Sequence, residues 1–221
     1  MNAQFNIKNE TLRLRPSLEI LVGRNWPLNE TARLCPIENK KIFSRIGFDS
    51  YKELFDIMED KMYLGIDGLT GIGISATQLG IPYQMMIVKG ELSPKKVFRI
   101  INPVILGKSE QSHTMTEGCL SFPGINFQIS RSEEIVVSFF DQEGYNSGPT
   151  SMNGMIAKVF QHEYDHLYGK FFFEKVSGLS RQVNRSLQRN LAKLDKRGEG
   201  YSNYMRKVFE NQASGEDESV E

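Results

Sequence analysis

The hexapeptide Gln161-His162-Glu163-Tyr164-Asp165-His166 constrains this chain more than any other stretch. Two histidines four residues apart lie on one face of a helix, so both side chains can bind the same metal ion. A glutamate directly after the first histidine is placed to accept a proton from a water molecule at that ion without being a ligand. Apolar residues at helical spacing precede the motif and Gly169 follows it, which predicts a helix reaching Leu167. The motif indicates a metal-dependent hydrolase.

The histidine pair needs a third ligand, because a catalytic zinc-type centre has three protein ligands and one open position. Astacin-like peptidases would have a histidine where this chain has Phe172. Thermolysin-like peptidases would take a glutamate from the next helix, but after Glu174 the next glutamate is Glu199, beyond the best helical stretch. That leaves Cys119 as a thiolate ligand. The alternatives without a metal are a buried, inert thiol and two histidines satisfied by hydrogen bonds in the core.

Length, charge and cysteine content limit the classes of protein to which this chain can belong. A chain of 221 residues is most simply one globular domain, and a net charge of zero argues against a surface that binds nucleic acid as a whole. Two cysteines form no disulfide framework, and the first residues lack the apolar core of a signal peptide. No stretch approaches about 18 consecutive apolar residues, the length of a membrane span. We therefore expect a cytoplasmic protein in a reducing environment.

Apolar periodicity predicts the main elements. A helix capped by Asp49 or Ser50 has an apolar stripe on one face: Tyr51, Leu54, Phe55, Met58 and Met62. Strands are predicted at 84–89, 97–101, 104–106, 125–129 and 134–141. Asn102-Pro103 is the predicted break between the second and third of these strands. Strands followed by helices predict an α+β fold, with antiparallel or mixed strands packed around a central metal-binding helix and a C-terminal helix.

The glycine-rich run 65–80 joins the first predicted helix to the strands. It lacks the lysine of a phosphate-binding loop, and no clear strand precedes it. Glycines permit close backbone approach, so the run suits a bed for an extended peptide with the amide of Gln78 projecting from it.

The two ends of the chain differ in character from the core segment 36–178, which we interpret as the catalytic domain. Residues 1–35 are an N-terminal arm without an assigned role. Residues 179–198 predict a helix with an apolar stripe of Val183, Leu187, Leu191 and Leu194. Its positive charges, ordinarily a solvated face, are Arg181, Arg185, Arg189, Lys193, Lys196 and Arg197. Residues 199–221 end in an acidic segment, and we expect a disordered tail.

Three ordered motifs resemble those of the peptide deformylase family: Gly71 to Gln78, Glu117 to Ser121, and Gln161 to His166. The similarity covers roughly Pro36 to Val176. It implies an enzyme that removes the N-terminal formyl group from formyl-methionyl nascent polypeptides and releases formate. The alternative is a deformylase-like protein that keeps a structural metal and binds peptides without turnover. Intact Glu163 and Gln78 favour the enzyme.

The resemblance also implies roles for individual residues. Cys119, His162 and His166 would bind the metal, and Glu163 would take the proton of the attacking water and return it to the departing amine. The side-chain amide of Gln78 and the backbone N–H of Leu120 would stabilise the charge on the formyl oxygen. Residues implied in substrate binding are Ile72, Gly73, Asn126, Met155, Lys158 and Val159.

The resemblance extends to the metal and the partners. The family usually works with ferrous iron, and zinc, nickel and cobalt also suit a Cys-His-His set. An ion pair between Arg131 and Glu117 is a candidate support for the cysteine loop. In deformylases that serve the ribosome a C-terminal helix can contact ribosomal RNA, so the basic helix is a candidate ribosome-binding element.

Four residues depart from the family pattern. Ser75 and Thr77 stand where alanine and proline are usual, and Asn126 stands where many relatives have a longer side chain such as arginine. Lys158 replaces a usually apolar residue of the methionine pocket. We favour a stem that packs along the pocket with its ammonium in water, which keeps methionine preference. The alternative is a charge at the pocket mouth that broadens acceptance toward polar or acidic first residues.

Overall fold

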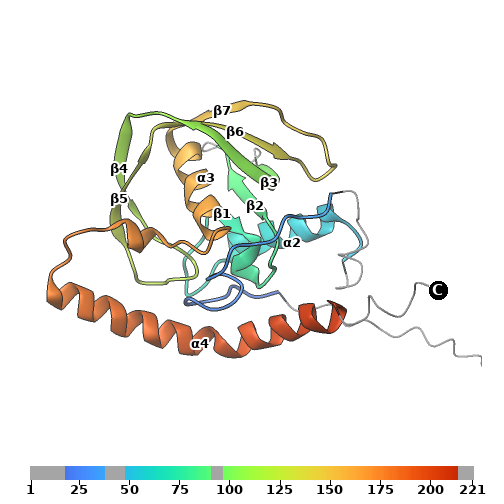
Figure 1. Cartoon of the computed structure of the whole chain (residues 1–221). Helices are drawn as coiled ribbons and strands as arrows, with labels where there is room; N and C mark the ends of the chain where they lie inside the picture. Colours follow the sequence, from blue (N-terminus) through green and yellow to red (C-terminus); the bar gives the residue numbers. More distant parts are fainter. Residues whose placement is uncertain (1–17, 38–47, 91–96, 214–221) are drawn as a thin grey trace, which may run out of the picture.

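The computed structural model describes residues 18–37, 48–90 and 97–213. Helix α3 lies between two antiparallel sheets, as Figure 1 shows. The larger sheet has the order β1-β2-β3-β6-β7, with β1 (Gly73–Ser75), β2 (Met85–Lys89), β3 (Val97–Lys108), β6 (Glu134–Phe140) and β7 (Thr150–Asn153). The smaller sheet pairs β4 (Ser112–Glu117) with β5 (Phe127–Ser132). This arrangement confirms the predicted α+β fold.

Five helical elements complete the described fold: the α-helices α2 (Tyr51–Leu64), α3 (Gly154–His166) and α4 (Arg181–Ala213), and the short 3-10 helices η1 (Ala76–Leu79) and η2 (Phe172–Lys175). In α2 the Ser50 side chain accepts a hydrogen bond from the Glu53 backbone N–H. All five apolar residues of the predicted stripe are buried there. No described helix combines the length and apolar character that crossing a membrane requires.

Strand β3 corrects the predicted break at Asn102-Pro103. The chain continues through these residues as one strand, with a register shift against β6 between Ile101 and Val104. Asn102 has φ 49°, and its side-chain amide bonds both the N–H (2.7 Å) and the C=O (2.8 Å) of Cys35. The asparagine therefore makes a bulge that clamps a neighbouring segment, which short-range turn signals do not distinguish from a strand end.

Other strands differ from their predicted positions or were missed. β5 begins at Phe127, two residues later than predicted, and β1, β4 and β7 had no predicted counterpart. β4 has mostly exposed polar residues, Ser112-His113-Thr114-Met115-Thr116-Glu117, so it lacks the apolar alternation on which strand prediction depends.

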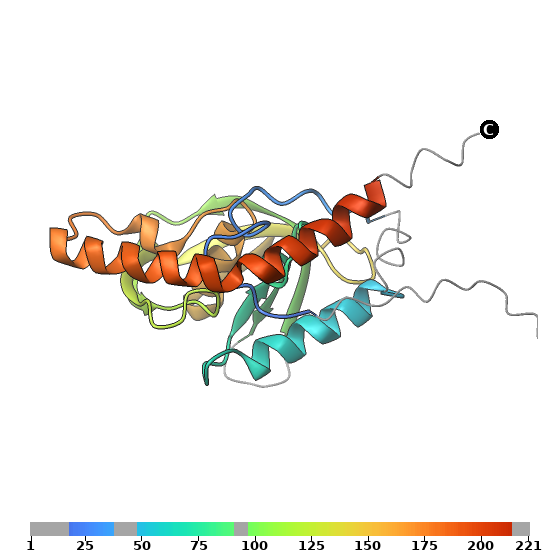
Figure 2. The same cartoon turned by 90° about the horizontal axis from the view of Figure 1, so that it is seen from below.

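Helix α4 corrects the predicted boundary at 198. It continues to Ala213 and runs across one side of the molecule, as Figure 2 shows. The extension is held because Met205 is fully buried and the Tyr201 hydroxyl donates to the Leu79 carbonyl at 2.8 Å. Val183, predicted to belong to the buried stripe, is 44% exposed, whereas Leu187 and Leu191 are buried. The acidic residues from Glu216 onward lie outside the described residues.

The described part of the N-terminal arm packs within the domain. Leu18 joins the core cluster around α2, and Leu21 and Leu28 join the cluster that includes Leu187 and Leu191 of α4. This segment therefore lies between α4 and the rest of the protein.

Candidate metal centre and cleft

The three predicted metal ligands meet at one point of the fold. His162 and His166 project from α3, and Cys119 lies in the loop after β4. One ligand atom from each residue lies within 4.8 Å of the other two. The Cys119 Sγ and His166 Nε2 atoms are 3.2 Å apart. The fold thus brings a cysteine in a loop next to two histidines on a helix that lie at least 43 residues later in the sequence.

The chemistry of the three side chains fits a divalent metal. The Nδ1 atom of His162 lies 2.8 Å from a Glu117 carboxylate oxygen, which leaves Nε2 as the nitrogen with a free lone pair. Burial, together with the electrostatic effect of its neighbours His162 and Arg131, holds the pKa of His166 well below its ordinary value, so its imidazole is neutral. Neutral imidazoles and a thiolate are the forms that bind metals. Burial and the nearby Glu163 raise the pKa of the Cys119 thiol, and a bound cation would favour its thiolate.

Glu163 is buried beside these ligands. Its Oε2 atom and His166 Nδ1 are the buried side-chain oxygen and nitrogen without a hydrogen-bond partner in the described part of the chain. Burial raises the pKa of Glu163 to about 8, against the opposing charge of Arg131. Gly73 permits this position, because a Cβ there would lie 2.7 Å from Glu163 Oε1. A carboxyl group with a free oxygen and such a pKa suits proton transfer near neutral pH.

The amide of Gln78 is held in one orientation on η1. Its Oε1 accepts from the backbone N–H of Ser75 at 2.9 Å, and its Nε2 donates to the Ser121 hydroxyl at 3.2 Å. The same Nε2 lies 3.4 Å from Cys119 Sγ. The N–H groups of the amide therefore face the metal-ligand loop.

Ser75 and Thr77 have hydrogen-bonding roles that the sequence did not indicate. The two hydroxyl oxygens are 3.0 Å apart, and the Ser75 hydroxyl also donates to Gln78 Oε1 at 3.2 Å. The Thr77 hydroxyl donates to the His166 carbonyl at 3.4 Å. These two residues connect the amide-bearing turn to the end of α3.

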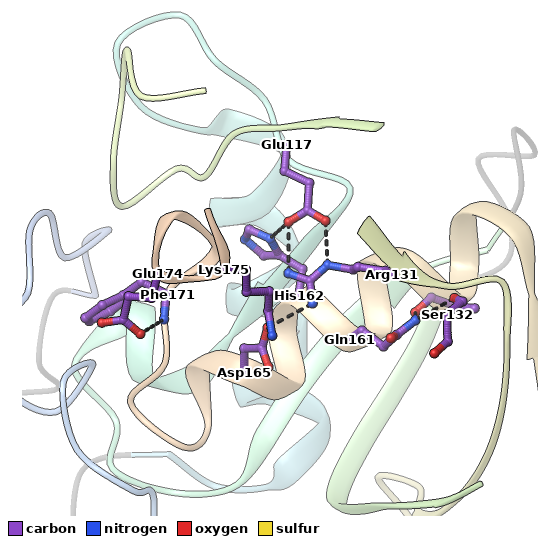
Figure 3. Close-up of polar contacts among 10 residues, drawn as sticks. Glu117, Arg131, Ser132, Gln161, His162, Asp165, Phe171, Glu174 and Lys175 are labelled. Carbon is purple, nitrogen blue, oxygen red and sulfur yellow. Dashed lines mark hydrogen bonds and ion pairs between the residues drawn. The ribbon is translucent and has the colours of Figure 1, made fainter. Parts of the chain in front are cut away.

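A buried ion-pair cluster supports the centre (Figure 3). Arg131 bonds Glu117 through Nε and Nη2, which bears out the predicted pair, and its Nη1 bonds Asp165 at 2.8 Å. Lys175 lies 3.1 Å from the same Asp165. Burial alone would raise the pKa of Glu117, but hydrogen bonds from His162 and Arg131 lower it to about 2. Glu117 is therefore ionised and orients His162. Asp165 and Lys175 were not identified from sequence.

An open cleft of about 360 Å³ lies over the centre. All the residues predicted to bind substrate line it: Ile72, Gly73, Asn126, Met155, Lys158 and Val159. Gln78, Leu120 and Glu163 line it as well, while His166 is buried behind it. The cleft places the predicted residues together, and their roles toward a substrate stay a prediction.

Lys158 does not send its ammonium into water as expected. Its side chain is 9% exposed, and Nζ lies 3.6 Å from Oε2 of Glu133, in the turn between β5 and β6. The ammonium instead pairs with this carboxylate, whose side chain is 32% exposed. Glu133 was not singled out from sequence.

The fold and this site define a class: an α+β protein with a Cys/His/His metal centre and a buried carboxyl group in an open cleft, the arrangement of metal-dependent hydrolases. The chain belongs to the polypeptide deformylase family, whose model matches residues 37–182.

Individual relatives agree with this membership. The chain is 36% identical over 164 residues to peptide deformylase 1B, chloroplastic/mitochondrial, of Arabidopsis thaliana, a match covering 73% of this chain and 56% of the relative. It is 37% identical over 141 residues to a peptide deformylase of Xylella fastidiosa, covering 63% and 79%. The crystal structure of the Arabidopsis protein superposes with a TM-score of 0.64 at 32% identity, covering 84% of this chain and 94% of that one. The chain spans little more than half the length of the plant relatives.

Proposed function

We propose that this protein hydrolyses the N-terminal formamide of formyl-methionyl peptides and releases formate. The observation that carries the proposal is Glu163, a buried carboxyl group with one free oxygen next to three metal-ligating atoms in an open cleft. The names of the relatives, peptide deformylases, support the same substrate class. A protein that only bound peptides, without turnover, would have no physical need of this carboxyl group.

Each step of the reaction has a residue in this chain. A divalent metal held by Cys119, His162 and His166 would polarise the formyl carbonyl and favour ionisation of water. Glu163 accepts the proton of the water that attacks the formyl carbon, and it delivers the proton to the nitrogen as the C–N bond breaks. Formate and a free amino terminus result.

Under this proposal two donors would stabilise the negative charge that develops on the formyl oxygen. One is Nε2 of Gln78, which lies 3.4 Å from Cys119 Sγ, and the other is the backbone N–H of Leu120, a residue that lines the cleft. Donors fixed in advance stabilise an oxyanion because they need no reorganisation, and removal of one such donor costs about 3 kcal/mol. The chain Ser75–Gln78–Ser121 fixes the amide for this purpose.

The metal in the cell is ferrous iron under this proposal. Zinc, nickel and cobalt also suit one thiolate and two imidazoles, since selection among these ions follows availability as much as affinity. Elemental analysis of protein purified without oxygen tests this point, and stoichiometric zinc in such material contradicts it.

Formate release from a formyl-Met peptide tests the function. The Glu163→Gln variant should keep stoichiometric metal and its thermal stability but lose at least about a hundredfold in kcat, because only the proton acceptor is missing. The exposed residue Glu199 on α4 provides the matched control, and Glu199→Gln should behave as wild type. Near-normal kcat in Glu163→Gln removes the base assignment. If the metal-loaded wild-type protein binds the peptide but releases no formate, the result favours the non-catalytic alternative.

We also propose that α4 binds ribosomal RNA. Arg181, Arg185 and Arg189 follow one face of the helix at four-residue spacing, and all three are exposed. Within the described part of the chain none of them has an ion-pair partner, unlike Arg197. Such free cations release counterions from phosphates on binding, so ribosome affinity should fall steeply as salt rises. Replacing the three arginines with glutamine should flatten that slope, and salt-independent binding defeats the proposal.

A further inference from the structure

We propose that Glu133 determines which first residue the cleft accepts, by holding the Lys158 ammonium away from the substrate side chain. This inference rests on the proposed function. It assigns a specificity role to a carboxylate that does not itself line the cleft. Glu133 would be a positioning residue that acts through Lys158.

Lys158 connects the cleft with Glu133. It lies on α3 one turn before His162 and lines the cleft, while its Nζ is 3.6 Å from Oε2 of Glu133, a residue that does not line the cleft. A lysine has a long apolar stem, so its methylenes can form the cleft wall while the charge lies beyond it. Apolar neighbours Val159 and Met155 continue this wall. The cleft therefore presents a surface suited to the unbranched thioether side chain of methionine.

The backbone holds the Glu133 carboxylate at this place. The Glu133 N–H donates to the Gln111 carbonyl at 2.9 Å, and its own carbonyl accepts from Gly154, the first residue of α3, at 3.0 Å. Its side chain is 32% exposed, so it remains hydrated while it faces a lysine that is 9% exposed. Glu133 is thus fixed relative to the helix that bears Lys158.

Other acidic groups near the cleft do not replace Glu133. Glu117 is engaged by Arg131 and His162, and Glu163 lies beside the metal ligands. Within the described residues, Glu133 is the acidic group within 4.0 Å of the Lys158 ammonium. An ammonium at a buried site needs a partner, because an unpaired buried charge is costly.

The consequence is a change of preference when Glu133 loses its charge. In the Glu133→Gln variant the ammonium lacks its partner, and a carboxylate at the end of a substrate glutamate supplies a new one inside the cleft. Acceptance of formyl-Glu peptides should rise, while formyl-Met peptides gain nothing from the freed charge. In wild type the pair is closed, and formyl-Met is strongly preferred.

The test measures kcat/KM for formyl-Met-Ala-Ser and formyl-Glu-Ala-Ser in wild type, Glu133→Gln, Lys158→Ile and the double variant. The Glu:Met ratio should rise at least about tenfold in Glu133→Gln, as for a newly formed charge pair. It should stay low in Lys158→Ile and return to that low value in the double variant. Glu134→Gln is the matched control, because Glu134 is the neighbouring exposed carboxylate without an ion pair to any described residue. Its ratio should equal that of wild type.

Three outcomes overturn the inference: an unchanged ratio in Glu133→Gln, a rise that persists in the double variant, or a wild type that hydrolyses both peptides equally. If Glu133 had only a structural role, its replacement would lower kcat/KM for both peptides alike and leave the Glu:Met ratio unchanged. If Glu133→Gln does not fold, Glu133→Asp withdraws the carboxylate by one methylene and should raise the ratio by a smaller factor. An unchanged ratio in that variant has the same meaning.

Binding separates this inference from the proposed function. Calorimetry of the same two peptides with metal-loaded protein in the Glu163→Gln background needs no turnover. There, the added Glu133→Gln change should shift relative affinity toward formyl-Glu by a similar factor, and an unshifted affinity contradicts the role of Glu133. If the wild-type protein releases formate from none of the peptides, the proposed function is wrong. The binding measurements still test the role of Glu133 in that case.

Discussion

At the scale of single residues, arginine–carboxylate ion pairs contribute differently to stability at a buried and at an exposed position of this molecule. Arg131 is 3% exposed and contacts two carboxylates, Glu117 and Asp165. Arg197 makes a two-bond pair with Asp67 at the surface. A buried carboxylate that loses its cation keeps the cost of its desolvation, whereas a surface carboxylate returns to water.

This contrast predicts the outcome of two matched substitutions. Arg131→Met should lower the free energy of unfolding by about 3 to 5 kcal/mol, because it leaves buried charges unpaired. Arg197→Met should change it little. Urea denaturation followed by circular dichroism measures both, and metal content reports whether His162 keeps its orientation. Equal effects of the two variants would mean that the Arg131 cluster is well hydrated.

Residue types at short spacing could be predicted from sequence, and partners brought together by the fold could not. The ligands His162 and His166, the carboxyl of Glu163 and the thiol of Cys119 belong to local motifs with recognisable chemistry. Glu133 pairs with Lys158 across 25 positions from a different element, and no local pattern marks such a pair. A lysine at position 158 is recognisable from the sequence as a departure from the family pattern, but the partner of its ammonium follows only from the tertiary fold.

At the scale of elements, α4 is tied to the metal-site loops through the segment before Pro27. Leu21 N–H donates to the Gln78 carbonyl at 2.7 Å, and Gly23 N–H donates to the Ser121 carbonyl at 2.9 Å. The neighbouring Arg24 and Asn25 bond Asp195 of α4. The helix therefore supports the turn that bears Gln78 and the loop that bears Cys119, in addition to any partner it contacts.

Two glycines in α4 test this support. A Cβ at Gly198 would lie 2.0 Å from the Val22 carbonyl oxygen, whereas a Cβ at Gly200 would meet nothing within 4 Å. Gly198→Ala should lower the free energy of unfolding by about 1 to 3 kcal/mol, as overpacking does, and should lower kcat. Gly200→Ala should raise it by up to about 1 kcal/mol through helix propensity. Thermal unfolding with formate assays measures both, and a harmless Gly198→Ala contradicts the close packing of α4.

Periodicity predicted the elements whose burial follows from their own sequence. The stripe of α2 and the strands β2 and β6 are of this kind. The second half of α4 has its own apolar stripe at helical spacing, Tyr201, Met205, Val208 and Phe209, which packs on the core cluster around α2. The predicted boundary at 198 missed this stripe, because the glycines Gly198 and Gly200 and the acidic end of the chain suggested a tail.

At the scale of the whole molecule, the contacts of α4 join the clusters of the core. Leu187 and Leu191 pack in the cluster around Phe122, and Met205 packs in the cluster around α2. Tyr201 borders both clusters. A helix shared between clusters in this way cannot leave without exposing both, so we expect the described domain to unfold as one cooperative unit.

The single tryptophan provides the measurement of that cooperativity. Trp26 packs edge-on against Phe209 of α4, lies 5.4 Å from the Arg206 guanidinium, and its carbonyl accepts from the Ser202 hydroxyl. Its fluorescence therefore reports the junction of α4 with the N-terminal segment, whereas far-ultraviolet circular dichroism reports all helices and strands. The two urea transitions should coincide, with formate release lost over the same range, because the junction and the metal loops depend on each other. A fluorescence change at lower urea, with activity retained, would make α4 a detachable appendage.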